Sequence, residues 1–160
     1  MSNAFIFPGQ GSQTVGMGRE VAEAFPEAKA MFDEVDEALG ENLSAIIWDG
    51  PEADINLTRN TQPALMAVSM AGLRALETRG ISVAKHAAFV AGHSLGEYSA
   101  LAAAGALTVA DTARLLKTRG QAMQRAVPVG EGAMAALLGL DVEQAIGVAR
   151  DAAGDGVCDA

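Results

Sequence analysis

The sequence of 160 residues has little cysteine, few aromatic residues and few basic ones. Its single cysteine, Cys158, has no partner for a disulfide within the chain, which is typical of a reducing compartment. Aromatic residues make up only 4% of the chain, so we expect helices that pack closely against a sheet. Hydrophobic residues make up 50% and charged residues 19%, which indicates a globular protein and excludes a disordered one.

Basic residues are outnumbered, with 11 Lys and Arg against 20 Asp and Glu and a net charge of −9. Such a chain is poorly suited to the phosphates of nucleic acid. The first basic residue is Arg19, so the N-terminus lacks the start of a signal peptide. The longest uncharged runs, residues 60–73 and 98–110, are shorter than the roughly 20 residues that cross a bilayer. We therefore expect a cytoplasmic protein with neither a nucleic-acid nor a membrane partner.

Two short apolar runs, residues 4–7 and 87–91, predict buried strands. Apolar residues at helical spacing occupy most of the chain between and after them. The expected helices cover residues 18–39 with a break near Pro26, 61–78, about 95–104, and from 108 or 111 to 127. This order of strands and helices predicts an α/β fold with a parallel sheet.

The pattern changes in the last fifth of the chain. We expect an α/β catalytic core over residues 1–128 and the truncated beginning of a small ferredoxin-like subdomain over residues 129–160. In the second segment, residues 133–140 predict a strand and residues 142–152 a helix, and Val157 opens a second possible strand.

Residues 92–96 (GHSLG) carry a Gly-x-Ser-x-Gly motif between an expected strand and an expected helix. This is the context of the nucleophile elbow of α/β-hydrolase-like folds, a turn so tight that it needs glycine around the serine. The helix that follows points its first N–H groups at the serine, so the Leu95 N–H is placed to stabilise an oxyanion. The alternative is an ordinary glycine-rich turn, but the correct flanks favour Ser94 as a nucleophile.

A nucleophilic serine needs a base, and the chain has only two histidines. His93 adjoins Ser94, and neighbouring side chains at a tight turn point in different directions. His86 precedes the strand and lies at its far end. The base is therefore missing from this chain, and we expect the 160 residues alone to be inactive.

Residues 9–11 (GQG) form the loop after the first expected strand. Loops at the carboxyl ends of parallel strands gather on one edge, so this loop is placed to supply a second oxyanion donor. A dinucleotide-binding loop is excluded because Thr14 stands where the third glycine would be.

Arg119 lies in the middle of an apolar stripe on an expected helix. A side chain that faces inward needs an anion, so the functional reading is a clamp for a substrate carboxylate. A structural salt bridge or a snorkelling side chain is the open alternative. The methionines, including Met123, are interpreted as core filler.

With these motifs in hand, the chain resembles the malonyl-CoA:acyl carrier protein transacylase family, which includes the acyltransferase domains of fatty acid and polyketide synthases. The resemblance covers the whole chain but only the front part of the family's domain. It rests on residues 7–13 (FPGQGSQ), 60–65 (NTQPAL), 92–98 (GHSLGEY) and 119–120 (RG). Because the first motif lies so near residue 1, we expect a freestanding enzyme.

The resemblance implies transfer of a malonyl group from CoA to the phosphopantetheine thiol of acyl carrier protein through an ester on Ser94, in fatty acid biosynthesis. It implies backbone donors to the oxyanion from Gln10 and Leu95, and substrate contacts from Arg119, Gln62 and His93. It implies no metal and no cofactor other than the substrate malonyl-CoA. The family's catalytic histidine lies in the later part of its domain, outside these 160 residues.

Two other readings remain at this point. The first is a serine esterase or thioesterase of the α/β-hydrolase class, which shares the elbow but has no use for Arg119 in its pocket. The second is a chain without catalytic function. A carboxylate clamp beside the serine would favour the transferase.

Overall fold

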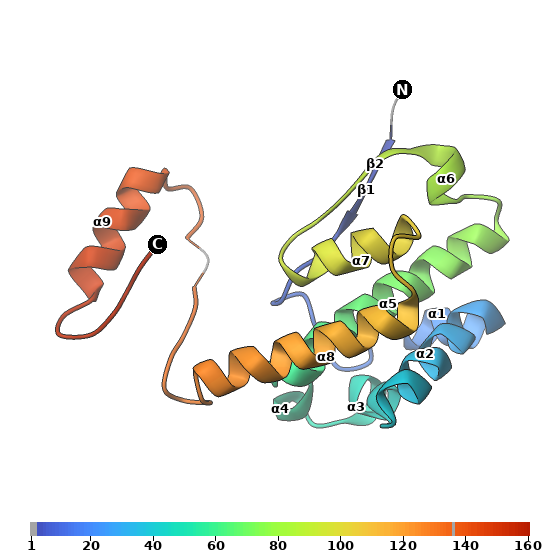
Figure 1. Ribbon diagram of the computed structural model, residues 1–160, viewed down its shortest axis with the longest axis horizontal. Coiled ribbons are helices and arrows are strands. Elements are labelled where there is room, and N and C mark those ends of the chain that lie inside the picture. The colour runs from blue at the N-terminus through green and yellow to red at the C-terminus, as the bar shows by residue number, and fades with distance from the viewer. Residues whose placement is uncertain (1–2, 136) are drawn as a thin grey trace. The chain divides into compact units, whose positions relative to one another are not determined.

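The computed structural model describes residues 3–135 and 137–160, which form an α/β protein with a small parallel sheet and many helices (Figure 1). Two compact units are found, one that ends at Pro128 and one that begins at Val129. The strands and helices, in chain order, are β1 (Asn3–Phe7), α1 (Arg19–Ala24), α2 (Pro26–Leu39), α3 (Leu43–Asp49), α4 (Glu52–Ile55), α5 (Thr58–Thr78), α6 (Val83–His86), β2 (Ala87–Gly92), α7 (Leu95–Ala103), α8 (Val109–Ala126) and α9 (Val142–Ala152).

The predicted strands and helices of the first unit are confirmed with small shifts at their ends. The break near Pro26 separates α1 from α2, and Pro26 is the first residue of the second helix, where its missing N–H costs nothing. Helix α5 begins at Thr58, three residues before the predicted start, because the N–H groups of Asn60 and Thr61 already bond to the Leu57 carbonyl.

Strands β1 and β2 pair in parallel, with Phe5 opposite Val90 and Phe7 opposite Gly92. Both strands therefore end at the same edge of the sheet. The loop after β1 and the turn after β2 leave the sheet side by side at this edge, which is where ligands bind in parallel α/β sheets.

The two strands are less buried than their apolar sequences predicted. On one face Phe7 is buried, but on the other Ile6 is 77% exposed and Phe89 is 72% exposed. Helix α7 contacts both strands, whereas the outward side chains have no layer over them among the described residues. Strands with apolar residues on both faces are typical of sheets that are buried on both faces. The described residues cover only one face of this sheet.

Helix α5 is the centre of the first unit and packs against α2, α7 and α8 (Figure 1). Close packing is helped by Gly120 of α8, where a Cβ would lie 2.7 Å from the Arg59 backbone of α5. The largest fully buried apolar side chains, which form this core, are Phe32, Leu43, Ile47, Ile55, Met66, Met70, Leu95 and Leu116.

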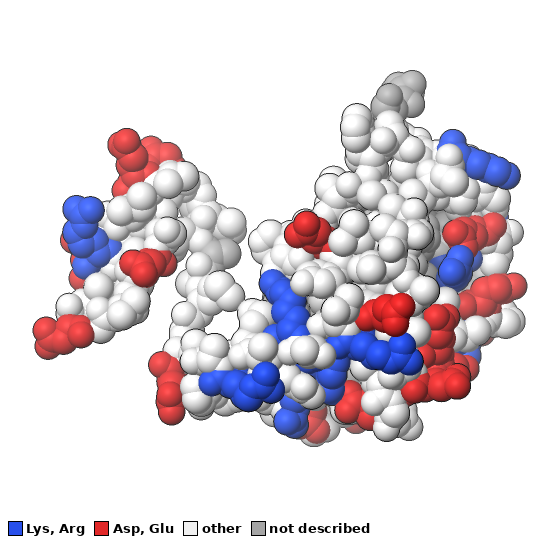
Figure 2. Space-filling view, in the orientation of Figure 1, with Lys and Arg blue, Asp and Glu red and all other residues white. Residues whose placement is uncertain are grey.

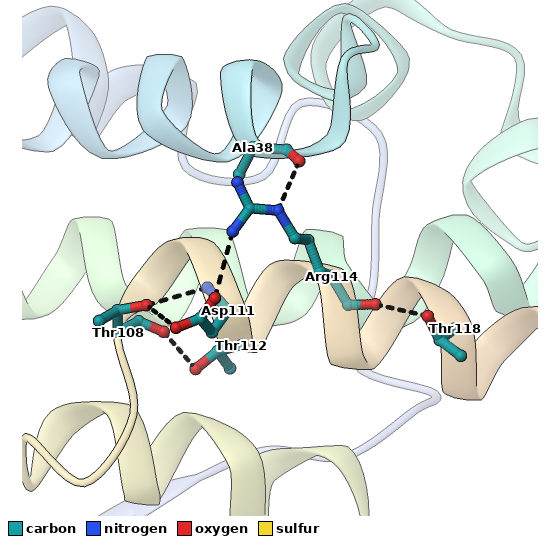
Figure 3. A network of polar contacts seen from close by, with 6 residues as sticks. All are labelled: Ala38, Thr108, Asp111, Thr112, Arg114 and Thr118. Carbon is teal, nitrogen blue, oxygen red and sulfur yellow. Dashed lines mark hydrogen bonds and ion pairs between the residues drawn. The ribbon is translucent and has the colours of Figure 1, made fainter.

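The start of α8 is held by a polar network (Figure 3). The Thr108 hydroxyl accepts a hydrogen bond from the Asp111 N–H and so caps the helix. Arg114, one turn further on, pairs with Asp111 and donates to the Ala38 carbonyl at the end of α2. These contacts orient the helix that carries Arg119.

The second unit contains the predicted helix, α9, whose N-terminus has a capping box made by Asp141 and Gln144. The predicted strand over residues 133–140 is not formed by the described residues there, and Ala136 lies outside them. No strand begins at Val157 either. A β-strand needs a neighbour for its N–H and C=O groups, and no described residue of this unit supplies one.

Candidate active site

Ser94 occupies a strained turn between β2 and α7. Among the residues that the structure describes, it is the one non-glycine residue with a positive φ, at 54° with ψ −109°. Such a conformation costs on the order of 1–3 kcal/mol and is held in place by its surroundings. A Cβ on Gly92 would overlap the backbone of Gly96, so the turn cannot form without glycine. The serine itself is exposed.

The loop after β1 lies directly against this turn. The His93 N–H donates to the Phe7 carbonyl across 3.1 Å. A Cβ on Gly96 would lie 2.7 Å from the Pro8 carbonyl oxygen, and one on Gly9 would overlap the His93 ring. The glycines therefore let the Gln10 loop and the Ser94 turn come within contact of each other.

Two backbone N–H groups are free at this junction. In the described part of the chain, neither the Leu95 N–H nor the Gln10 N–H has a hydrogen-bond acceptor. Leu95 is the first residue of α7, where an N–H has no acceptor within its own helix. The Gln10 side chain donates to the Thr58 hydroxyl at 3.4 Å, which ties the loop to the start of α5. Because they are unpaired, these two N–H groups are available to donate hydrogen bonds to an oxyanion.

Arg119 reaches Ser94 from α8. Its Nη2 donates to the Ser94 Oγ at 3.0 Å and its Nη1 to the Gln62 Oε1 at 2.8 Å, and its guanidinium lies 5.9 Å from the centre of the Tyr98 ring. The structural salt bridge, left open by the sequence, is not formed: the side chain is half-buried and the described residues offer it no carboxylate. It faces the serine instead of the core.

Gln62 is 1% exposed and lies between two residues of α8. Its Oε1 accepts from Arg119, and its Nε2 donates to the Met123 Sδ at 3.0 Å. Met123 was interpreted from the sequence as core filler. The spacing of four residues between Arg119 and Met123 places both on one face of α8. This spacing was the sequence feature that could have associated Met123 with the site of Arg119.

Neither histidine of the chain acts on Ser94 in this arrangement. His93 stands over Gly9, and its ring makes no hydrogen bond to any described residue. His86 is exposed at the opposite end of β2, where its Nδ1 contacts the backbone of Ser82. The site therefore contains a serine, two free N–H groups and a guanidinium, with no base among the described residues.

Basic side chains gather over α8, although the chain is acidic overall (Figure 2). Lys117 pairs with Glu41 and Arg114 with Asp111. Arg119 and Arg125, on the half of α8 nearer its C-terminus, have no acidic partner among the described residues. This region is therefore able to attract an anionic ligand.

The chain was compared with known proteins. Residues 4–155 match the family model described as the acyl transferase domain. The chain is 53% identical over 140 residues to the malonyl CoA-acyl carrier protein transacylase of Bacillus subtilis strain 168, an alignment that covers 88% of this chain and 43% of that protein.

Solved structures agree with this result. The acyl-carrier-protein-S-malonyltransferase of Bartonella henselae superposes with a TM-score of 0.90 at 57% identity, over 98% of this chain and 50% of that one. A malonyl-transacylase in complex with its type II polyketide synthase acyl-carrier protein superposes with a TM-score of 0.86 at 43% identity, over 97% of this chain and 49% of that one. The chain spans about half the length of the relatives it matches. Because the family model matches residues 4–155 of the 160 residues, the chain belongs to the acyl transferase domain family.

Proposed function

We propose that this chain carries the nucleophile of an enzyme that transfers a malonyl group from CoA to the phosphopantetheine thiol of acyl carrier protein, in fatty acid biosynthesis. The contact between the Arg119 guanidinium and the Ser94 hydroxyl at 3.0 Å carries this proposal. Relatives named as malonyl CoA-acyl carrier protein transacylases support it, and so does a related transacylase bound to its carrier protein. We also propose a cytoplasmic location for this reaction.

In the first half of the proposed reaction, the Ser94 Oγ attacks the thioester carbonyl of malonyl-CoA. The hydroxyl proton passes to a base outside these 160 residues, which the family resemblance identifies as a histidine. The negative charge that develops on the carbonyl oxygen is held by the N–H groups of Leu95 and Gln10. The C–S bond then breaks, and the CoA sulfur leaves with the proton from the base.

The second half repeats these steps with the carrier protein as acceptor. The thiol of its phosphopantetheine arm gives its proton to the base and attacks the ester carbonyl on Ser94. The C–O bond to Ser94 breaks, and its oxygen regains the proton. The malonyl group is now a thioester of the carrier protein, and no net proton has been consumed.

Arg119 accounts for the choice of a malonyl group. In a malonyl ester on Ser94, one methylene separates the ester carbonyl from the free carboxylate. A guanidinium that reaches the Ser94 Oγ therefore also reaches this carboxylate, and it can bind both oxygens with paired N–H donors. Gln62 would hold the guanidinium from behind, and the exposed His93 would line the entrance to the site.

The finer description of the fold belongs to the same proposal. A strand, a serine with a φ of 54° and a helix in succession support an α/β-hydrolase-like core over residues 1–128. Residues 129–160 would be the beginning of a ferredoxin-like subdomain, with α9 as its first helix. The structure of a longer form of the protein, with strands on both sides of α9, is the test of this part.

The function is tested by mass spectrometry of the longest natural form of the protein after exposure to malonyl-CoA. We expect a malonyl ester on Ser94 that disappears when acyl carrier protein is added, with malonyl appearing on the carrier. The Ser94→Ala variant should retain its circular dichroism spectrum and take up no malonyl. If the ester is hydrolysed by water as fast as it is transferred to the carrier protein, the protein is a hydrolase. Malonyl on another residue of the Ser94→Ala variant would refute the assignment of Ser94.

A further inference from the structure

The Gln62 side chain connects Arg119 to a methionine that the proposed reaction does not use. Gln62 extends from α5 and is almost fully buried, so its amide has no access to solvent as an alternative partner. Its oxygen lies 2.8 Å from Arg119 Nη1 and its nitrogen lies 3.0 Å from Met123 Sδ. The amide therefore has one partner at each end, and both partners belong to α8.

The chemistry of these partners allows one orientation of the amide. A guanidinium can only donate hydrogen bonds, and a thioether sulfur can only accept them. With the amide turned over, its NH₂ group would face the guanidinium and its oxygen would face the sulfur, and both contacts would be repulsive. Met123 thus helps to keep the Gln62 oxygen directed at Arg119.

The orientation matters because it fixes the end of a long side chain. The guanidinium has two hydrogen bonds in the described part of the chain, one to Gln62 and one to Ser94. Because the Ser94 hydroxyl is replaced by an ester during the proposed reaction, the bond to Gln62 is the one that can persist when the acyl group is in place.

We propose that Met123 is a positioning residue, which orients the Gln62 amide and thereby holds Arg119 where it selects acyl groups that end in a carboxylate. This inference rests on the proposed function for its consequence in substrate choice. The contacts among the three side chains do not depend on that function. An apolar residue of the same shape at position 123 would fill the same space but accept no hydrogen bond.

The substitution Met123→Leu tests this in the longest natural form of the protein. We expect kcat/KM for malonyl-CoA to fall about two- to tenfold, the effect of one modest hydrogen bond. The value for acetyl-CoA, which has no carboxylate to place, should stay within about twofold of the wild type. The matched control is Met70→Leu, at a buried methionine of α5 without a hydrogen bond among the described residues. This substitution should leave the ratio of kcat/KM for malonyl-CoA to kcat/KM for acetyl-CoA unchanged.

Double substitutions separate positioning from packing. In an Arg119→Ala background, Met123→Leu should have no further effect on malonyl loading, because it acts through Arg119. The same should hold in a Gln62→Leu background. Equal losses for malonyl-CoA and acetyl-CoA, or full additivity with Arg119→Ala, would overturn the proposal and leave Met123 as a packing residue.

A readout without substrate distinguishes failure of this inference from failure of the proposed function. In protein labelled with ¹⁵N, Met123→Leu should shift the NMR signals of the Gln62 side-chain amide and the Arg119 Nε–H, and Met70→Leu should shift neither. If the signals move and the wild type forms no malonyl ester, the positioning contact stands and the proposed function fails. If Met123→Leu leaves both signals in place, the inference is wrong whatever the activity.

Discussion

Ser94 lies in the turn before α7 and Arg119 lies on α8, and the two side chains meet at an exposed point of the first unit. The serine is held in a strained conformation at the start of α7, and the arginine crosses from α8 to reach it. Without substrate, the Ser94 hydroxyl accepts a hydrogen bond from the guanidinium that would bind a substrate carboxylate in the proposed reaction. The same contact thus connects the proposed nucleophile with the group that we propose to recognise the acyl chain.

At the scale of single residues, Arg119→Ala should reduce malonyl loading much more than acetyl loading. A charge-assisted, paired hydrogen bond is lost only with malonyl, so kcat/KM for malonyl-CoA should fall on the order of 10- to 100-fold. Since Arg119 is half-buried and not fully desolvated, kcat/KM for acetyl-CoA should change by only about twofold. The measurement is kcat/KM for both thioesters in the longest natural form of the protein.

Arg119→Lys is the control for this substitution. Lysine keeps the charge but loses the planar fork, so it should restore only part of the malonyl activity. An equal loss for both substrates in Arg119→Ala would instead identify Arg119 as a structural residue. The malonyl assignment would then lose its main physical support in this chain.

At the scale of elements, the turn between β2 and α7 depends on glycine for space as well as for backbone freedom. The carbonyls of Phe7 and Pro8 and the backbone of Gly96 fill the volume around it. Gly96 is the second residue of α7 and is buried against the loop after β1. The geometry of the nucleophile is therefore supported by two loops that belong to different strands.

Gly92→Ala should disrupt this turn and destabilise the fold. Its Cβ would overlap the Gly96 backbone, which cannot move without shifting α7, and we expect the free energy of unfolding to fall by about 3 kcal/mol, the upper end of the usual cost of overpacking. The matched control is Gly72→Ala in the interior of α5, where a Cβ meets nothing within 4 Å. This change should stabilise the protein by about 0.5–1 kcal/mol. Urea unfolding of residues 1–160 measures both, and a Gly92→Ala variant as stable as the wild type would contradict the described turn.

At the scale of the whole molecule, the outward face of the sheet is apolar and uncovered in the described chain. Ile6 pairs beside Ala91, and Phe89 pairs beside Ala4, so the two exposed side chains lie on the same face. We expect residues 1–160 in isolation to bind an apolar fluorescent dye at this face.

The double variant Ile6→Thr, Phe89→Thr should reduce the fluorescence of the bound dye severalfold. Both side chains are largely exposed, so each change should alter the free energy of unfolding by less than about 0.5 kcal/mol. The control Met134→Thr removes an apolar side chain of the second unit that is even more exposed and should leave the dye signal nearly unchanged. If the double variant binds as much dye as the wild type, the sheet face is not the exposed apolar surface.

Residues 1–160 alone should transfer little or no malonyl. A serine without a base is a weak nucleophile at neutral pH, and among the described residues neither histidine ring forms a hydrogen bond with Ser94. The measurement is the rate of release of CoA from malonyl-CoA by the purified fragment, compared with the longest natural form. A comparable rate would show that one of these two histidines serves as the base.

Within the described residues, no helix is long and apolar enough to cross a lipid bilayer.

The sequence by itself determined the features that depend on neighbouring residues. The strand, glycine, serine and helix signals around Ser94 lie within a few positions of one another, so they predicted the turn correctly. The longer helices were predicted because their apolar residues recur at helical spacing, and they differ from the prediction mainly at their first and last residues. The short helices α3, α4 and α6 were not predicted. The helical stripe also indicated that Arg119 faces other residues of the protein.

Only the tertiary structure decided what those residues face. Arg119 is 25 positions from Ser94 and 57 from Gln62, and no local pattern specifies which of many possible pairs will meet. The role inferred for Met123 was hidden for the same reason, since its partner lies 61 positions away on α5. The burial of the strands was overestimated because a local apolar run shows what a strand can bury and not what covers it. Contacts of this kind depend on how α5, α7 and α8 pack, which is decided by the balance of interactions over the whole unit.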